Sequence, residues 1–200
     1  MKADETRRRI VIAADRLFYE QGYENASFAD FAQAVEISRG NFYYHFKTKD
    51  AVLAAVIEHR LDERKAMLRQ WEQEDDNPAS RIKSFINILI ANQTKIMAFG
   101  CPVGTLCTEL AKLDHALKSE AARLFTLFAE WLEQQFAELG CGDQASDLAM
   151  HLLMRSQGVA SLANTFQDAK FVRREVDAMH QWLDQQTPST TTKDMKRDQY

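Results

Sequence analysis

Apolar side chains recur along this chain at intervals of three and four residues, the spacing that places them on one face of an α-helix. The first run contains Ile10, Ala14, Leu17 and Phe18. It is predicted to end at Gln21-Gly22, because glycine commonly follows the last turn of a helix. The same periodicity continues to about residue 185, and the whole chain has only 7 glycines and 3 prolines. The pattern therefore predicts an all-α fold.

Short polar side chains mark the expected helix starts, because they accept hydrogen bonds from the free N–H groups of a first turn. In chain order the predictions are Ser27 before a helix over 28–34, Ser38 before one over 38–44, Thr48 before one to about Trp71, Asn77-Pro78 before one to Phe99-Gly100, Cys101-Pro102 before a short one, and Asp114 before a seventh. Two last helices are predicted over about 144–165 and 169–185.

The two short helices over 28–34 and 38–44 are joined by three residues, Val35-Glu36-Ile37, which predicts a helix-turn-helix. In that motif the first residues of the second helix face the edges of DNA bases in the major groove. Arg39 can bind guanine through two hydrogen bonds and Asn41 can bind adenine in the same way, while Gly40 lets the backbone approach the duplex. Ile37, Phe42 and Phe46 are predicted to face inward.

An unusual mixture of rings and cations surrounds this helix start. Tyr43, His45, Lys47 and Lys49 are suited to contacts with phosphate groups, which position a protein on DNA without reading its sequence. Alternatively, the rings form a packed cluster without a ligand and the cations are simply solvated. The candidate DNA-binding residues are Ser27, Phe28, Ser38, Arg39, Gly40, Asn41, Tyr43, Tyr44, His45, Lys47 and Lys49.

Charge and composition narrow the setting of this site. The formal net charge is −4, so a nucleic-acid site must be a local patch. No apolar run reaches the length of a membrane span, and the N-terminus lacks the apolar stretch of a signal peptide. The three cysteines are odd in number and lack the spacing of a disulfide framework, which favours a reducing compartment. We therefore expect a cytoplasmic protein with no membrane partner. The predicted domains are 1–49 for DNA binding, 50–186 for effector binding and dimerisation, and a disordered polar tail over 187–200.

The segment "SFADFAQAVEISRGNFYYHFKTKDAVL", residues 27–53, resembles the TetR family of bacterial transcription regulators. The features that agree in order and without a gap are Ser27, Ala32, Ile37-Ser38, Gly40, Tyr43, His45-Phe46, Lys49 and Leu53. One position departs from the family: Glu36 stands where glycine is common in the turn. A turn that needs a positive φ would be strained by this residue.

The resemblance implies a repressor that binds a palindromic operator as a homodimer and is released by a small effector. It also implies that the last two long helices build a four-helix bundle between two chains. Apolar candidates for that interface are Leu148, Leu152, Val159, Leu162, Phe171, Val172, Met179 and Trp182, each of which could instead belong to the core of one chain.

The resemblance further implies an effector pocket among the middle helices. The candidate lining residues are Phe85, Leu89, Gln93, Met97, Cys101, Phe125, Phe128, Trp131, His151, Met154 and Gln157, although each could be a plain core residue. Aromatic rings, methionines and a few polar groups suit a small, largely apolar molecule.

Cys101 stands directly before Pro102, at the expected start of a helix. A helix N-terminus can stabilise a thiolate, so this sulfur could capture an electrophilic effector. If it is instead buried near Phe85 and Phe125, it serves as a packing atom and the effector binds without a covalent bond. The sequence leaves both alternatives open.

Two other classes of protein compete with a regulator. The five histidines show no HExxH spacing, and neither a nucleophile elbow nor a glycine-rich phosphate loop is present, so no catalytic residue, metal or cofactor is predicted. A helical small-molecule-binding or adaptor protein without sequence-specific DNA binding is the main alternative. Such a protein would have no need of Arg39, Gly40 and Asn41 at a helix start.

Overall fold

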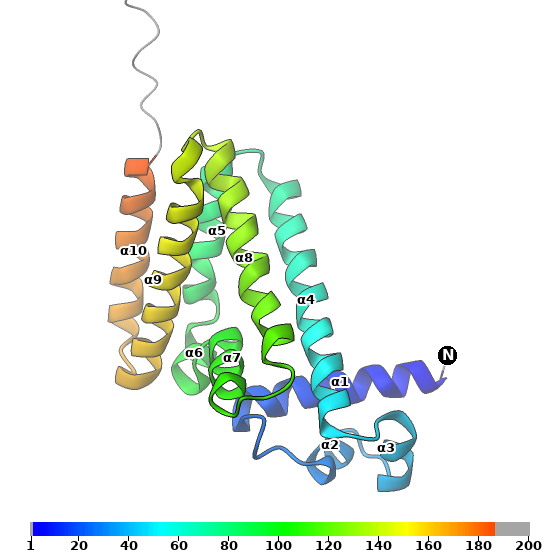
Figure 1. The fold of residues 1–200 in the computed structure, drawn as a ribbon. Helices are drawn as coiled ribbons and strands as arrows, with labels where there is room; N and C mark the ends of the chain where they lie inside the picture. The colour runs from blue at the N-terminus through cyan, green and yellow to red at the C-terminus, as the bar shows by residue number, and fades with distance from the viewer. Residues whose placement is uncertain (1, 187–200) are drawn as a thin grey trace, which may run out of the picture.

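The computed structural model describes residues 2–186, and all regular elements in that range are helices (Figure 1). They are α1 Lys2–Gln21, α2 Phe28–Ala34, α3 Arg39–His45, α4 Lys49–Glu74, α5 Pro78–Ala91, α6 Gln93–Phe99, α7 Pro102–Lys112, α8 Lys118–Glu138, the 3-10 turn η1 Gly142–Gln144, α9 Ala145–Phe166 and α10 Ala169–Gln186. The predicted all-α class is confirmed. The tail predicted to be disordered, 187–200, lies outside the described residues.

The helices form a small unit and a larger bundle. In Figure 1, α1 lies across the lower end of the bundle with α2 and α3 beneath it, and α4 rises from this unit beside α8. The helices α5, α8, α9 and α10 run along one another, with α6 and α7 near their lower ends and α9 and α10 at the outer edge. Helix α1 packs against α4 and α7, so the small unit is seated directly on the larger one.

Local capping explains why the small unit begins its helices where the sequence predicts. Ser27 and Asp30 form a capping box, in which the Ser27 Oγ accepts from the Asp30 N–H and the Asp30 carboxylate accepts from the Ser27 N–H. This bonding lowers the pKa of the Asp30 carboxyl. The Ser38 Oγ accepts from the Asn41 N–H at 3.2 Å, and the Thr48 Oγ1 accepts from the Ala51 N–H at 3.1 Å. These three predicted caps are confirmed.

Two predicted boundaries in the larger unit are wrong. The helix expected from Asn77-Pro78 to Phe99 is broken at Asn92, whose side chain donates to the carbonyl oxygen of Ile88 and whose backbone leaves the helical region. The side chain thereby competes with the helical hydrogen-bond ladder. Asp114 does not cap α8: it follows the end of α7 with φ 48°, and α8 begins four residues later at Lys118, with which Asp114 forms an ion pair.

The turn between α2 and α3 holds Glu36 at φ 56°. The Glu36 N–H donates to the Gln33 carbonyl and the Ile37 N–H donates to the Ala32 carbonyl, which is the pattern of a helix end closed by one left-handed residue. Arg9 of α1 donates to the neighbouring Val35 carbonyl at 2.8 Å. The turn therefore adopts a positive φ, which glycine would accept without strain.

Aromatic packing fixes α3 against the rest of the small unit. Phe42 and Phe46 are buried as predicted, and Ile37 is partly buried. The Phe42 ring lies 6.0 Å from the Phe31 ring and 5.0 Å from the Phe28 ring, measured between centroids. Because one face of α3 is held in this way, its opposite face is presented to solvent in a fixed orientation.

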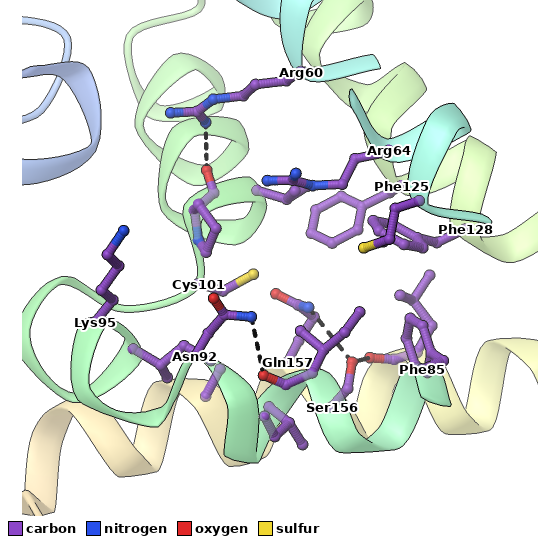
Figure 2. Close-up of a pocket in the computed structure, with 18 of the residues that line it drawn as sticks. Arg60, Arg64, Phe85, Asn92, Lys95, Cys101, Phe125, Phe128, Ser156 and Gln157 are labelled. Atoms are coloured by element: carbon purple, nitrogen blue, oxygen red, sulfur yellow. Dashed lines mark hydrogen bonds between the residues drawn. The ribbon is translucent and has the colours of Figure 1, made fainter. Parts of the chain in front are cut away.

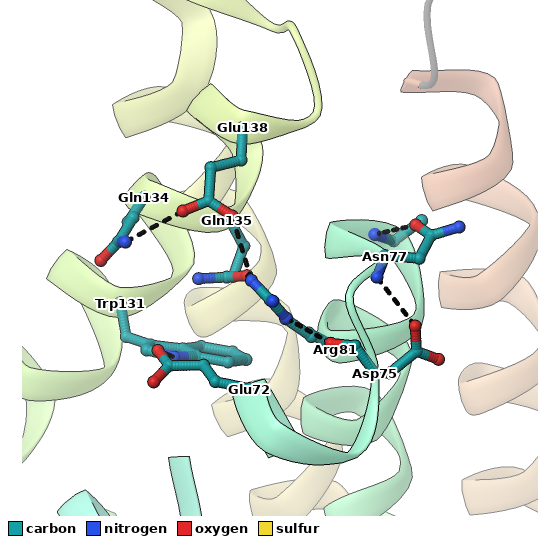
Figure 3. A network of polar contacts seen from close by, with 9 residues as sticks. Glu72, Asp75, Asn77, Arg81, Trp131, Gln134, Gln135 and Glu138 are labelled. Atoms are coloured by element: carbon teal, nitrogen blue, oxygen red, sulfur yellow. Dashed lines mark hydrogen bonds and ion pairs between the residues drawn. The ribbon is translucent and has the colours of Figure 1, made fainter. Parts of the chain in front are cut away.

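At the far end of the bundle, Arg81 ties three helices together (Figure 3). Its guanidinium donates to the Asp75 carbonyl at the end of α4, and to Gln135 and Glu138 of α8 at 3.1 and 3.0 Å. Nearby, the Trp131 indole N–H donates to Glu72 at 2.8 Å. These contacts fix the end of α4 and the start of α5 against α8.

Replacing Glu36 by glycine is expected to stabilise the protein by about 0.5–1 kcal/mol, because relief of the left-handed strain outweighs the added freedom of the unfolded chain. Urea denaturation at fixed protein concentration measures this change. Glu36→Ala is the control, since alanine removes the charge but keeps the strain, and it should give no such gain. A glycine variant no more stable than the alanine variant would contradict the assignment of strain.

Candidate nucleic-acid interface and ligand cavity

The start of α3 presents polar groups to solvent. Arg39, Gly40 and Asn41 are exposed, and neither the Arg39 nor the Asn41 side chain bonds to another residue within 2–186. The Asn41 backbone is held by the Ser38 cap. Tyr43 and Tyr44 are 44% and 71% exposed, although the Tyr43 ring also packs edge-on against Phe28 and Phe42. The exposed side of α3 thus has donors suited to base edges flanked by rings suited to a sugar-phosphate backbone.

The remaining candidates around α3 divide into exposed and structural residues. Lys47 is exposed, and His45 packs edge-on against Tyr44. Phe28 packs against Phe31, Phe42 and Tyr43, so most of its ring contributes to the core of the small unit. Ser27 is occupied by its capping box. These two residues position the surface, whereas Lys47 belongs to it.

Lys49 has a structural task that the sequence did not reveal. Its ammonium donates to the Glu24 carbonyl at 2.9 Å and lies 4.5 Å from the centre of the Tyr23 ring. Burial lowers the pKa of Lys49, although the nearby carboxylates of Glu109, Glu24 and Asp50 oppose the shift. The side chain is therefore already engaged within the chain, and its replacement would disturb the loop before α2 as well as any phosphate contact.

That loop is fastened to the larger unit by Glu109 of α7. The Glu109 carboxylate accepts from the backbone N–H groups of Tyr23 and Glu24 at 2.8 and 3.0 Å. The Tyr23 hydroxyl donates to Asp50 at 2.6 Å and lies 3.1 Å from the His115 Nε2. Burial and the bond to Asp50 raise the pKa of Tyr23, so it remains a neutral donor. The small unit is thus bonded to α7 and to the start of α4.

A cavity of about 390 Å³ lies between the small unit and the larger bundle (Figure 2). Its volume is in the range that suits a small ligand. Six predicted lining residues are on its wall: Phe85, Leu89, Cys101, Phe125, Phe128 and Gln157. The wall also contains residues of α1 and the start of α7, so an occupant would touch the helix on which the helix-turn-helix packs.

Five other predicted lining residues lie away from this cavity. Gln93 donates to the Ala169 carbonyl, and the Met97 carbonyl accepts from Asn164, so both join α6 to the outer helices. Trp131 packs on Trp71 near the far end. His151 lies against Trp182, and Met154 is 62% exposed on α9. The spacing of these residues was correct for α-helices, but the rotation of each helix turns them away from the cavity.

Charged side chains on the cavity wall were missed by the sequence reasoning. They are Asp15, Arg60, Glu63, Arg64 and Lys95. A signal was present, because Arg60 and Arg64 continue at four-residue spacing the inward-facing row that starts at Val52 and Val56. A cation within an apolar row of a helix marks either a buried ion pair or a polar cavity.

Arg60 is the most buried charge in the described structure, with 2% of its surface exposed. Its guanidinium donates to the Asp15 carboxylate of α1 at 2.5 Å. It also donates to the Pro102 carbonyl at the start of α7 at 2.6 Å, the bond drawn from Arg60 in Figure 2. Beside it, the Tyr19 hydroxyl donates to the Gly100 carbonyl at 2.8 Å. Burial and the nearby Cys101 raise the pKa of Tyr19 to about 12. Arg60 therefore joins α1, α4 and α7 at the cavity wall.

The three cysteines are free thiols. Cys101 lines the cavity at the N-cap of α7, where its Sγ accepts from the Gly104 N–H at 3.4 Å. Burial raises the pKa of Cys107 to about 11, and its thiol donates to the Ala121 carbonyl. Burial also raises the pKa of Cys141. Cys101 is the cysteine that a cavity ligand could reach.

An apolar stripe is exposed along α9. Met150, Met154, Leu162 and Phe166 are 56%, 62%, 43% and 66% exposed, and Gly158 continues the same four-residue spacing. A Cβ atom added at Gly158 would meet nothing within 4 Å. The partly buried rings of Phe171 and Trp182 on α10 also pack against the core.

The residues predicted for a dimer interface differ in their burial within the single chain. Leu152, Val159, Val172 and Met179 are buried in the core of the single chain. Leu162 is exposed, whereas Leu148, Phe171 and Trp182 are partly buried. The exposed apolar surface therefore lies along α9, whereas the exposed residues of α10 after its first position are charged or polar, and Leu162 is the predicted residue that belongs to the stripe.

Comparison with known proteins agrees with this geometry. Residues 10–56 match the model described as "Bacterial regulatory proteins, tetR family". The chain is 26% identical over 178 residues to an uncharacterised HTH-type transcriptional regulator in the lacX 3′ region of Lactococcus lactis subsp. lactis, covering 87% of this chain and 91% of that protein. It is 25% identical over 155 residues to the HTH-type transcriptional repressor DhaR of Mycobacterium sp. (strain GP1), covering 76% and 77%.

The fold is shared by solved structures over nearly its whole length. A TetR-family transcriptional regulator from Cytophaga hutchinsonii superposes with a TM-score of 0.82 at 16% identity, covering 94% of this chain and 98% of that one. The residues matched by the family model carry the helix-turn-helix, and the described chain shares the fold of TetR-family regulators of known structure. The chain is therefore similar to the TetR family of transcriptional regulators. No helix within residues 2–186 is long and apolar enough to cross a membrane.

Loss of Asp15 and loss of Arg60 should lower the free energy of unfolding by different amounts. Asp15→Ala leaves a buried guanidinium without its carboxylate and should lower the free energy of unfolding by about 3 kcal/mol. Arg60→Met removes the buried charge and fills its volume, so it should cost less. Urea denaturation of both variants and of the double variant tests this order. Equal losses in the two single variants would contradict the view that the buried cation dominates the energetics.

Proposed function

We propose that this protein is a TetR-family regulator, a cytoplasmic homodimeric repressor that binds a palindromic operator and is released by a small molecule in the cavity. The observation that carries the proposal is the start of α3, where Arg39, Gly40 and Asn41 are exposed on a helix held firmly from behind. The alternative, a helical ligand-binding or adaptor protein, gives these exposed side chains no task.

Dimer formation is supported by the stripe on α9. Isolated apolar side chains are common on protein surfaces, but four large ones at regular helical spacing mark an interaction surface. Gly158 lies at the middle of the stripe and would let two copies of α9 approach closely where they cross. A two-fold axis through this surface would place two copies of α3 on one side of the dimer, and a palindromic site matches that symmetry.

Release by a ligand is supported by the construction of the cavity wall. Asp15 and Tyr19 belong to α1, and Cys101 and Pro102 to the segment that opens α7. An occupant that pushes α7 away from α1 would shift the Glu109 contacts that hold the loop before α2. Such a shift would change the separation of the two DNA-reading units, which is coupling between two distinct sites. An electrophilic occupant would meet the Cys101 sulfur.

Selection of duplexes from a random pool by the full chain tests the proposed function. We expect an enriched, two-fold symmetric sequence with two half-sites. Failure to enrich any symmetric sequence would contradict operator binding and favour the adaptor alternative.

Variants on the selected duplex should separate base reading from phosphate contact. Asn41→Ala should cost about 1–3 kcal/mol on the preferred sequence and relax preference at one position in each half-site. Lys47→Ala should weaken all sequences and reduce the dependence of binding on salt by about one unit for each subunit. Arg69→Ala, an exposed cation of α4, is the matched control and should behave as wild type. Fluorescence anisotropy at several salt concentrations measures all three.

A bulky residue at the centre of the α9 stripe should break the dimer. Gly158→Phe leaves the fold of one chain intact, since open space surrounds the position, but it prevents close approach of two copies. Light scattering should show monomers, and the affinity for the operator should fall because one subunit contacts only one half-site. The control is Ala122→Phe, at an exposed position of α8, which should remain dimeric. A dimeric Gly158→Phe variant with full operator affinity would place the interface elsewhere.

A further inference from the structure

The cavity has an apolar side and a cationic side. The apolar side consists of Phe85, Leu89, Phe125 and Phe128, with the Phe85 and Phe128 rings 5.5 Å apart. On the other side, Arg60 and Arg64 of α4 and Lys95 of α6 contribute three positive charges. Figure 2 shows the Arg64 guanidinium directed into the space above Cys101 and Gln157, next to the Phe125 ring.

The partners of these cations differ. Arg60 is satisfied by Asp15 and by the Pro102 carbonyl. Arg64 has only a long contact to Glu63, at 3.8 Å, and donates no hydrogen bond to any residue within 2–186. Glu63 is itself shared with His59, at 3.4 Å, and is half exposed. Lys95 is exposed at the edge of the cavity and has no partner in the same range.

The arrangement therefore leaves the Arg64 guanidinium, about three-quarters buried, without a hydrogen bond to any residue of the described range. A guanidinium has five N–H donors in a planar fork that matches a carboxylate or phosphate group. Two carboxylates also line the cavity, but Asp15 is bonded to Arg60, and Glu63 lies at the outer limit of an ion pair with Arg64. The three cations outnumber the two carboxylates, so the wall has a formal charge of +1.

We infer that the effector is an amphipathic anion: a small molecule with a carboxylate or similar acidic group on an apolar body. Its acidic group binds the Arg64 guanidinium, with Lys95 contributing at the edge, and its body packs against Phe85, Phe125 and Phe128. That this ligand acts as an effector rests on the proposed function, whereas the claim that the cavity binds such an anion does not. A neutral amide of the same shape could accept a hydrogen bond from Arg64 through its carbonyl oxygen, but it would offer neither the negative charge nor the second acceptor oxygen of a carboxylate.

Calorimetry with matched pairs of ligands tests this inference without DNA. The probes are a series of straight-chain and aromatic carboxylates and their primary amides, which share size and shape but lack the charge. Wild type should bind the best acids at least about tenfold more tightly than the corresponding amides, as expected for a hydrogen bond to a charged group. Arg64→Met should lose this preference while still binding the apolar body.

Two further variants control for folding and for charge. Arg69→Met, an exposed arginine of α4 outside the cavity, should keep the full preference. Arg64→Lys keeps a cation at the same position and should retain part of it, which separates loss of charge from loss of fold if Arg64→Met is poorly folded. Lys95→Met should reduce the preference by a smaller factor than Arg64→Met.

Three results would overturn the inference. They are equal binding of acids and amides by wild type, a preference for acids that survives in Arg64→Met, and no saturable binding of any acid up to its solubility limit. The same acids are then added to the complex of protein and operator. An acid that binds the cavity but leaves the protein on its operator would contradict release by ligand, while the chemical class inferred for the cavity would stand.

Discussion

The buried guanidinium of Arg60 is the constraint on which the arrangement of the two units depends. A buried charged group is stable only when its hydrogen-bond donors find acceptors. The acceptors for the Arg60 guanidinium are the Asp15 carboxylate on α1 and the Pro102 carbonyl at the start of α7. Satisfying this one side chain fixes three helices relative to one another. The same side chain lines the cavity, so any occupant meets the contact that seats the small unit on the bundle.

From this contact a continuous set of bonds leads to the DNA-facing surface. Helix α7 carries Glu109, which holds the loop before α2, and that loop also receives the Lys49 ammonium. The aromatic rings Phe28, Phe31 and Phe42 then fix α3 against α2. Packed rings and satisfied hydrogen bonds do not deform gradually, so we expect a displacement of α7 to be passed on to the loop before α2 rather than absorbed.

The small unit was predictable because its signals are local. Ser27, Ser38 and Thr48 each cap a helix within three residues along the chain, and the inward positions Phe42 and Phe46 follow from helical spacing. The departure at Glu36 was also visible, and the structure shows that the turn does require a positive φ there. The residues exposed at the start of α3 are those that the sequence singled out.

The larger unit was less predictable because its important features depend on how helices are rotated against one another. Trp131 and His151 have the same spacing as true cavity residues but face other neighbours. Leu152 and Val159 were equally plausible at an interface, yet they fill the core, while Met150 and Phe166 remain outside. The break at Asn92 was hidden because the apolar pattern continues across it.

Spin-label distances between the two DNA-reading units of a dimer test most directly the claim that the cavity wall holds these units in place. The label is attached at Gln33→Cys, an exposed position on α2, which packs against α3, in a chain whose three natural cysteines are replaced. With Arg60 intact, the free dimer should give a narrow distribution that overlaps the one measured on operator DNA. In Arg60→Met the distribution should broaden or shift, and operator affinity should fall. An unchanged distribution with unchanged affinity in a folded Arg60→Met dimer would contradict the account.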